Sequence, residues 1–334
     1  MLKYIIKRLL LLIPVLFGIS LVVFIVMHLF TADPAALILG QHATQAQIQA
    51  LREDMGLNDP IYVQFGRFLW NLLHGDLGRS LMTRRPVVQE FVARFPATIE
   101  LALFSLLLAT VVGILAGIIS AVKRYSFWDY ASMFGALLGV SMPIFWLGLI
   151  LIIVFGVNLQ WLPVAGRIDI GFEPATLTHF YLLDSLLTGN WTAFWSTIRH
   201  MILPGIALAA YSMAIIARMT RSTMLEVIKQ DYIRTAHAKG LSESRVIKHH
   251  ALKNALIPVV TVIGLQLGFL LGGAMLTETV FSWPGIGSLT INAILASDYP
   301  MVQGSVLLVA TVFVLVNLMV DLLYAYLDPR IRYS

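Results

Sequence analysis

The sequence has no cysteine and few charged residues. Among its 334 residues, Lys and Arg number 23, Asp and Glu number 18, and charged residues make up 12% of the chain, against about 25% in typical soluble proteins. The absence of cysteine excludes disulfides, thiolate metal sites and a cysteine nucleophile. Hydrophobic residues reach 58% and the mean hydropathy is +0.83. We therefore expect the chain to lie in a membrane and to contact lipid.

Several nucleotide-binding and catalytic motifs are also absent from the sequence. No G-x-x-x-x-G-K-[ST] loop is present, so the chain lacks the backbone cradle and lysine that hold ATP phosphates. The absence of H-E-x-x-H and G-x-S-x-G argues against a metalloprotease or a serine hydrolase. His249 and His250 are neighbours, so on a helix their rings diverge by about 100° and do not readily share a metal. We expect no catalytic residue, metal site or cofactor in this chain.

Long apolar runs dominate the sequence instead and predict six transmembrane helices. A run of about 20 residues crosses about 30 Å of hydrocarbon at 1.5 Å per residue. The expected spans cover residues 9–30, 98–122, 130–157, 201–217, 255–276 and 302–327. Pro143 lies inside the third span and predicts a kink there. The predicted fold class is an all-α integral membrane protein.

The distribution of charge gives the expected orientation of the spans. With six spans and both termini in the cytosol, 15 of the 23 Lys and Arg residues lie inside and 8 lie outside. This asymmetry agrees with the positive-inside rule. Because the charges are separated by topology and do not form one basic surface, nucleic-acid binding is not expected.

The loops divide the chain into three predicted parts. Residues 1–30 hold a cytosolic N-terminus and the first span. Residues 31–97 are polar and mixed, with a turn signal at Asp59-Pro60, and predict an extracytoplasmic subdomain. Residues 98–334 form the core, with an external segment at about 158–199 and a cytosolic loop at about 218–254. Whether 179–187 enters the bilayer stays open.

The cytosolic loop is the most informative segment. Residues 218–253 carry eight Lys or Arg against three acids, and each charge at the bilayer centre costs about 3 kcal/mol, so the loop stays in water. Tyr232 to Lys239 has a helix-forming composition, and Gly240 is placed to end that helix in the left-handed conformation. Ser242 can cap a second helix. Two short helices with a small-residue face predict a knob that enters a partner; the alternative is a solvated basic loop that only fixes orientation.

Polar residues inside the expected spans are few. Gln266, Asn317 and Asp321 are the clearest, and Glu100 and Glu278 lie at outer boundaries. A membrane-embedded ionisable residue is a functional candidate by default, but Asp321 is close enough to the cytosolic end for a structural role. A proton-coupled transporter is expected to carry more buried carboxylates. The glycines of the fifth span, at 264, 268, 272 and 273, predict close helix packing.

The spacing of the cytosolic loop resembles the coupling loop of ATP-binding-cassette importer permeases, in which a Glu-Ala-Ala triplet precedes a glycine and a Leu-Pro follows. Arg234, Thr235 and Ala236 stand at the triplet, Gly240 stands at the glycine, and Leu252-Lys253 stands at the Leu-Pro. Arg234 and Lys253 depart from the pattern. Further matches are GLNDP, GDLGRS, RFPATIEL, SMPIFW, RMTRS, LTETVFSWPGIG, DYPMVQG and DPRIR. In this order they resemble the peptide and nickel branch of the family, especially first dipeptide permease subunits.

The resemblance implies a type I importer permease fold and a subunit that forms a translocation path with a homologous second permease in the inner membrane of a bacterium. Two cassette ATPases would bind ATP and Mg, and an extracytoplasmic solute-binding protein would deliver dipeptides or short peptides. The implied coupling residues are Asp231, Arg234, Thr235, Ala236, Ala238, Lys239 and Gly240. An external loop over the path would hold Glu278, Phe281, Trp283 and Pro284.

Other interpretations remain at this stage. Sister systems in the same family carry nickel, glutathione or haem. A secondary transporter or channel would need no ATPase and would draw coupling ions through buried carboxylates. A membrane scaffold would use the loop only for docking, and it would show no nucleotide-dependent flux.

Overall fold

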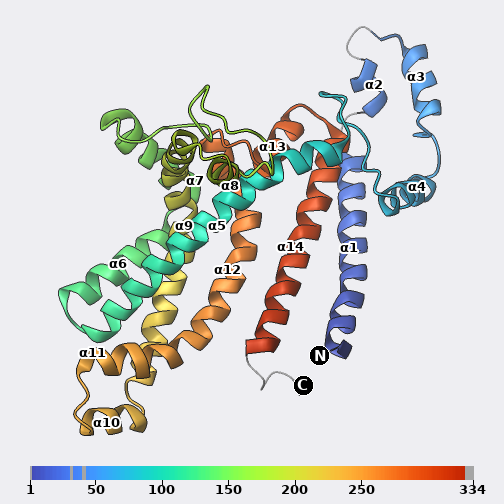
Figure 1. Cartoon of the computed structure of the whole chain (residues 1–334). Coiled ribbons are helices and arrows are strands. Elements are labelled where there is room, and N and C mark those ends of the chain that lie inside the picture. The colour runs from blue at the N-terminus through green and yellow to red at the C-terminus, as the bar shows by residue number, and fades with distance from the viewer. Residues whose placement is uncertain (1, 31–32, 40–42, 328–334) are drawn as a thin grey trace. The chain divides into compact units, whose positions relative to one another are not determined.

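The computed structural model describes residues 2–30, 33–39 and 43–327. These residues form helices joined by loops (Figure 1), with one isolated β-bridge between Arg79 and Pro86. The helices are α1 (Leu2–Phe30), α2 (Pro34–Leu39), α3 (Gln45–Asp54), α4 (Ile61–Leu73), α5 (Val87–Val122), α6 (Phe127–Ser141), α7 (Ile144–Leu151), the π-helix η1 (Ile152–Asn158), α8 (Tyr181–Leu187), α9 (Trp191–Val227), α10 (Asp231–Ala238), α11 (Glu243–Arg245), the π-helix η2 (Val246–Ala251), α12 (Leu252–Val280), α13 (Ile286–Leu295) and α14 (Tyr299–Leu327).

Five helices of the described chain are long and apolar enough to cross a membrane. They cover Leu10–His28, Val87–Val122, Trp191–Val227, Glu243–Gly272 and Tyr299–Val320. A sixth span arises if α6 and the α7–η1 helix are counted as one broken span. The described residues therefore confirm the predicted all-α fold, and the number of spans is six when the broken pair is counted as one.

The predicted third span is broken rather than kinked. Met142 has an extended backbone, with φ −87° and ψ 132°. The ring of Pro143 disfavours helical geometry at the residue before it, so α6 ends at Ser141 and α7 begins after the proline. The two halves meet at an angle of 110°.

The contacts divide the chain into two compact units, which we describe separately. Unit 1 holds Met1–Phe95 and Gly285–Ser334, and unit 2 holds Pro96–Pro284. In unit 1, α1 and α13 each pack against α14, and α1 also contacts α4. A buried core there contains Val87, Leu289, Ala293, Met301 and Val302. This division follows contacts within the chain, and the domain boundaries expected from the sequence stay predictions.

In unit 2 the central element is α9, against which α6, α7, α8 and α12 pack. In the most apolar 18-residue stretch of α9, 67% is buried. With 37 residues, α9 is about 55 Å long at 1.5 Å per residue, well beyond the roughly 30 Å of bilayer hydrocarbon. The helix therefore extends outside the hydrocarbon, and its C-terminal end leads directly into α10.

Candidate functional site

Helix α10 ends as the sequence predicts. Gly240 has φ +75°, and its N–H donates to the carbonyl of His237 at 2.9 Å. The N–H of Leu241 donates to the carbonyl of Ala236 at 3.4 Å. These two bonds form a Schellman motif, in which a left-handed glycine satisfies the last helical carbonyls. The left-handed conformation expected at Gly240 is confirmed.

The second helix of the loop begins at the predicted place but is not separate. Helix α11 starts after Ser242, whose side chain makes no capping hydrogen bond. It continues through the π-turns of η2 into α12. The second half of the loop, from Glu243 on, is thus continuous with the fifth membrane helix. A π-helical turn in a long helix is often found at functional positions.

One side of α10 is buried against the rest of unit 2. Ile233 and Ala236 lie in a core cluster with Ala121, Met224, Val246, Ala251 and Ala255. At its N-terminal end, the Tyr232 hydroxyl accepts a hydrogen bond from Asn254 Nδ2 at 2.8 Å. Helix α10 is therefore fastened to the ends of both α9 and α12.

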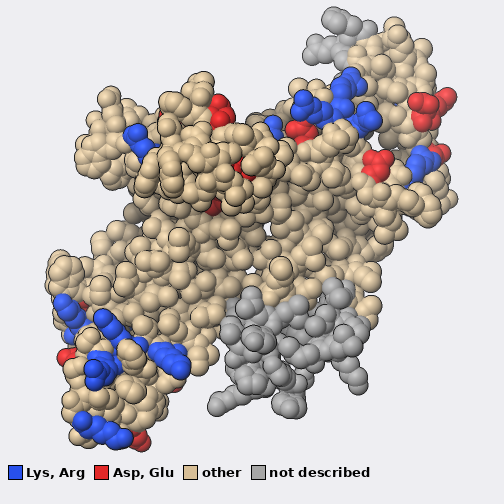
Figure 2. Space-filling view, viewed as in Figure 1, with Lys and Arg blue, Asp and Glu red and all other residues tan. Residues whose placement is uncertain are grey.

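The opposite side of α10 is exposed. Asp231, Arg234, Thr235 and Ala238 follow i, i+3, i+4, i+7 spacing, which places them on one helical face. We call this set the outer face of α10. Its ion pair, Arg234 Nη1 to Asp231 Oδ1 at 3.6 Å, is exposed at both ends and contributes little stability. Figure 2 shows Lys and Arg gathered around this end of unit 2, at the lower left.

Six of the seven predicted coupling residues are exposed, and Ala236 is not. Lys239 and Gly240 are exposed beside the outer face of α10. Ala236 packs into the chain's own core, so it contributes to holding α10 in place. The predicted small-residue face is therefore represented at the surface by Ala238 alone.

A buried carboxylate joins α6 to α9 near this site. Arg221 donates to Asp129 through Nε at 3.0 Å and Nη2 at 3.1 Å. The Ser120 hydroxyl and the Tyr125 N–H also donate to the Asp129 carboxylate. Bidentate charge-assisted pairs are among the strongest polar contacts in proteins. Sequence reasoning missed this pair; an isolated Asp opening an apolar helix three residues after Ser126 was the available signal.

The predicted external loop is largely buried in unit 2. Of Glu278, Phe281, Trp283 and Pro284, only Pro284 is exposed. Glu278 Oε1 accepts a hydrogen bond from the Thr98 hydroxyl at 2.6 Å, and Trp283 Nε1 donates to the Ala97 carbonyl at 2.9 Å. These contacts fix the end of α12 to α5. Contact with substrate at the three buried residues would require them to become exposed, and the predicted role of this loop stays a prediction.

A second buried ion pair holds the segment between η1 and α9. Arg167 Nη2 donates to Glu100 Oε2 at 2.5 Å and to the His179 carbonyl at 2.8 Å. The Leu182 N–H donates to the other Glu100 oxygen at 2.8 Å, and the Arg167 guanidinium lies 3.7 Å from the Tyr181 ring centroid. The sequence indicated Glu100 but not Arg167, which is 67 residues away along the chain.

Asp184 organises the same segment from the first turn of α8. Its carboxylate accepts hydrogen bonds from the N–H groups of Leu177, Thr178 and His179 and from the Thr178 hydroxyl. Burial alone raises the pKa of the Asp184 carboxyl, but these hydrogen bonds outweigh it and hold the pKa below its ordinary value.

The polar residues expected inside the spans have mixed outcomes. Gln266 Oε1 accepts a buried hydrogen bond from the Ser212 hydroxyl at 2.8 Å, joining α12 to α9. The side chain of Asp321 lies outside those that the structure describes. Across the described residues, no group of three or more His, Asp or Glu side chains is placed to hold a metal ion.

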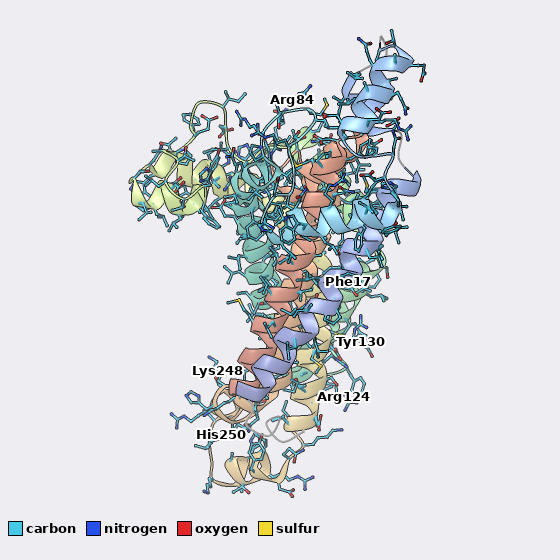
Figure 3. All side chains as sticks on the ribbon, turned by 90° about the vertical axis from the view of Figure 1, so that its right-hand side faces the viewer. Phe17, Arg84, Arg124, Tyr130, Lys248 and His250 are labelled. Carbon is cyan, nitrogen blue, oxygen red and sulfur yellow. The ribbon has the colours of Figure 1, made fainter. Side chains whose placement is uncertain are left out.

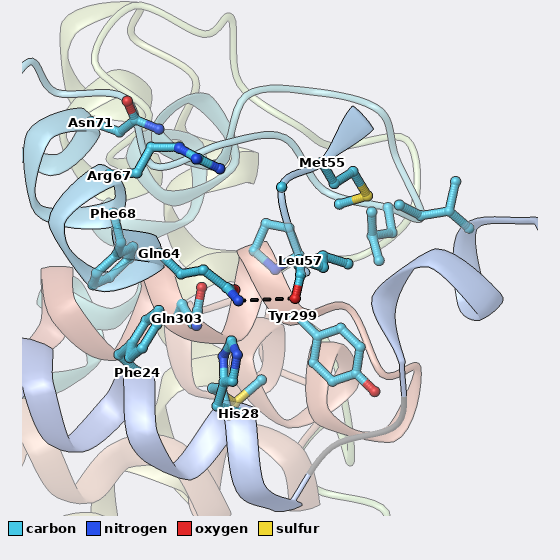
Figure 4. A pocket seen from close by; sticks show the side chains of 15 residues that line it. Phe24, His28, Met55, Leu57, Gln64, Arg67, Phe68, Asn71, Tyr299 and Gln303 are labelled. Carbon is cyan, nitrogen blue, oxygen red and sulfur yellow. Dashed lines mark hydrogen bonds between the residues drawn. The ribbon is translucent and has the colours of Figure 1, made fainter. Parts of the chain in front are cut away.

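Unit 1 contains a cavity of about 310 Å³ beside α1 and α4 (Figure 4). Phe24 and Phe68 form part of its apolar wall. Gln64 Nε2 donates to the carbonyls of Leu57 at 3.0 Å and Asp59 at 2.8 Å. These bonds use the Gln64 amide to hold the loop before α4, so the arrangement stabilises the subdomain around the cavity.

Known proteins resemble this chain along its whole length. The family described as binding-protein-dependent transport system inner membrane component matches residues 113–333, and the N-terminal family of the same membrane component matches residues 1–102. The dipeptide transport system permease protein of Alkalihalophilus pseudofirmus is 54% identical over 333 residues, and the di/tripeptide transport system permease protein of Pseudomonas aeruginosa is 51% identical over 335 residues. Both alignments cover 100% of each chain.

A solved structure supports the fold. The inward-facing MetNI methionine ABC transporter contains a chain with TM-score 0.51 and 17% identity, covering 70% of this chain and 93% of its own. This likeness confirms the predicted type I importer permease fold. The apolar helices and the family matches together show a multi-pass membrane protein. The chain therefore belongs to the family of inner membrane components of binding-protein-dependent transport systems.

Proposed function

We propose that the chain is the permease subunit of an ATP-driven importer that carries dipeptides and other short peptides. The observation that carries this proposal is the outer face of α10, exposed on one side and fastened to α9 and α12 on the other. Two close relatives are named for dipeptide and di/tripeptide transport, which supports the choice of substrate.

The proposed partners follow from the family and from what the chain lacks. Two cassette ATPases bind ATP and Mg, since this sequence has no phosphate loop. The outer face of α10 is the surface of this chain that docks on an ATPase. A homologous second permease completes the translocation path. An extracytoplasmic solute-binding protein delivers the peptide, in keeping with the description of the family.

Transmission in this proposal is a rigid-body movement through packed helices. When the ATPases close, they displace α10. Because Ile233 and Ala236 are packed around Met224 of α9, and Asn254 of α12 is bonded to Tyr232, displacement of α10 tilts both membrane helices. The Asp129–Arg221 pair extends the movement from α9 to α6.

The proposed topology has both termini and α10 in the cytosol. A single-cysteine test suits this chain, which has no native cysteine. Ser244 and Glu173 are both exposed and lie in the proposed cytosolic loop and external segment. In intact cells, a membrane-impermeant maleimide should label the Glu173→Cys variant and not the Ser244→Cys variant; inverted vesicles should reverse the result. Labelling of Ser244→Cys in intact cells would contradict the orientation.

The test of the proposed function is extraction of the tagged chain in mild detergent from its native host, followed by identification of co-purifying proteins and a transport assay of the recovered complex. We expect a second permease and two kinds or copies of cassette ATPase, and uptake of radiolabelled dipeptide. Recovery of the chain alone would contradict the importer assignment. Uptake of labelled nickel but not dipeptide would keep the importer and overturn the substrate.

A further inference from the structure

A second cavity, of about 590 Å³, lies along α9 in unit 2 just before α10. Arg218, Arg221 and Lys229 line it, together with one acid, Glu226. Arg218, Arg221 and Glu226 come from the last turns of α9, Lys229 follows its end, and Met133 of α6 also lines the cavity. Arg221 is already paired with Asp129, so Arg218 and Lys229 against Glu226 leave the cavity with one net positive charge.

Two of these cations are free to bind an anion. Within the part of the chain that the structure describes, the side chains of Arg218 and Lys229 are exposed and form no ion pair or hydrogen bond. Arg221 differs, because its Nε and Nη2 groups are held by Asp129. Arg221 is thereby fixed at the cavity wall, while Arg218, one turn before it on the same helix, keeps all its donors. A site that combines one oriented guanidinium with a second whose donors are unsatisfied suits a phosphate group.

The depth of the cavity is marked by aromatic residues on α6. Asp129, which pairs with Arg221, lies in the first turn of α6. Around that turn Phe127 is 76% exposed, Trp128 56% and Tyr130 63%, and Tyr130 projects from the edge of unit 2 (Figure 3). Exposed Trp and Tyr are enriched where a membrane protein passes through the headgroup layer. The Asp129–Arg221 pair therefore places the cavity at headgroup depth.

We propose that this cavity binds the headgroup phosphate of an anionic phospholipid from the leaflet on the α10 side. Basic pockets between membrane helices on the cytosolic side are suited to anionic headgroups. An acidic surface of a partner protein could also pair with these cations. The exposed aromatic residues of α6, and Met133 in the lining of the cavity, instead favour a partner with acyl chains. Arg218 and Lys229 supply the charge, and Arg221 supplies a fixed donor.

The test measures phospholipid binding to the delipidated full chain in its detergent-extracted complex, using phosphatidylglycerol and phosphatidylcholine as probes and native mass spectrometry as readout. Each surface cation contributes roughly a fivefold factor to the binding of an anionic lipid. We expect Arg218→Gln to weaken phosphatidylglycerol binding by about fivefold, and Arg218→Gln with Lys229→Gln by about 25-fold. Phosphatidylcholine should bind weakly to every variant.

The matched control is Lys253→Gln, which removes an exposed cation at the same end of unit 2 but outside the cavity. It should leave phosphatidylglycerol binding unchanged. Wild-type binding by the Arg218/Lys229 double variant would overturn the proposal. Displacement of the lipid by millimolar inorganic phosphate would assign the cavity to a soluble anion instead. If the Arg218/Lys229 double variant no longer co-purified with the ATPases but bound phosphatidylglycerol as the wild type does, the cavity would be assigned to a protein partner.

Discussion

At the residue scale, the few charged groups inside unit 2 are matched to specific donors or acceptors. Glu100 is paired with Arg167, and Asp129 with Arg221, and all but Arg221 are nearly fully buried. An unpaired buried charge costs several kcal/mol, whereas a paired and hydrogen-bonded charge is tolerated. These pairs also join segments that are distant in the sequence, since Asp129–Arg221 joins α6 to α9 and Glu100–Arg167 joins α5 to the loop before α8.

Asp184 gives the sharpest prediction for one side chain. Because its folded pKa is depressed, it stabilises the segment above the pKa of an unfolded Asp, about 4, and this stabilisation is lost as pH falls through the folded value. In Asp184→Asn, hydrogen exchange at the amides of residues 177–179 should quicken by about ten- to a hundredfold at pH 7, since bonds to a charged group contribute about 1.5–3 kcal/mol.

Measuring the exchange of these amides as a function of pH separates the effect of the Asp184 charge from that of its shape. As the pH falls below about 4, the wild type should approach the exchange behaviour of Asp184→Asn measured at the same pH. Glu173→Gln is the control, because Glu173 is exposed and accepts one hydrogen bond, from the Gly171 N–H at 3.2 Å. Equal protection of these amides in the wild type and Asp184→Asn at pH 7 would show that the carboxylate does not organise the segment.

At the element scale, α6 approaches α9 closely enough for one glycine to decide the contact. A Cβ added at Gly139 would lie 2.8 Å from the Ala210 carbonyl oxygen, whereas one at Gly135, a turn earlier on α6, would meet nothing within 4 Å. Gly139→Val should therefore be destabilised by about 1–3 kcal/mol relative to Gly135→Val through overpacking. Thermal unfolding in detergent measures this difference, and equal unfolding temperatures would exclude the close approach.

The outer face of α10 can be tested without disturbing its core. Ala238 is exposed, so Ala238→Trp should leave the fold intact while the added bulk prevents α10 from entering an ATPase groove. We expect dipeptide uptake by the complex to fall at least tenfold, with normal membrane insertion. Ala238→Ser, which adds one hydroxyl, is the matched control and should retain uptake. Normal uptake by Ala238→Trp would remove α10 from the coupling mechanism.

The sequence predicts features of α10 that are local and misses those that depend on distant residues. Gly240 was identifiable because a left-handed helix end favours glycine. The burial of Ala236 could not be predicted from the sequence, because it depends on Met224 and Val246, which come close to Ala236 only in the folded chain. For the same reason Arg167 was not connected to Glu100.

The same distinction explains the membrane helices. Hydropathy located the spans, because their composition is local, and Pro143 marked the interruption of the third. The 110° angle at that interruption depends on how α6 and α7 each pack against α9. Close packing expected at the glycines of the fifth span is not found at Gly272, where a Cβ would meet nothing within 4 Å. It is found at Gly139, where a backbone carbonyl from another helix approaches.

At the scale of the whole molecule, the chain exposes apolar surface that water would not tolerate. Along α5, Leu103, Leu107, Leu115 and Ile119 are exposed at intervals of four or eight residues, so they form one uncovered helical stripe. In a membrane protein such a stripe contacts lipid or another apolar subunit. This surface agrees with a subunit that lies within a membrane.

The central claim is that peptide transport through this chain is driven by ATP hydrolysis in its partners. The most direct measurement is uptake of a radiolabelled dipeptide by the complete complex reconstituted in vesicles, with ATP, with a non-hydrolysable analogue, or with a proton gradient alone. The account predicts uptake only with ATP. Uptake driven by the proton gradient in the absence of ATP would contradict it and would identify a secondary transporter.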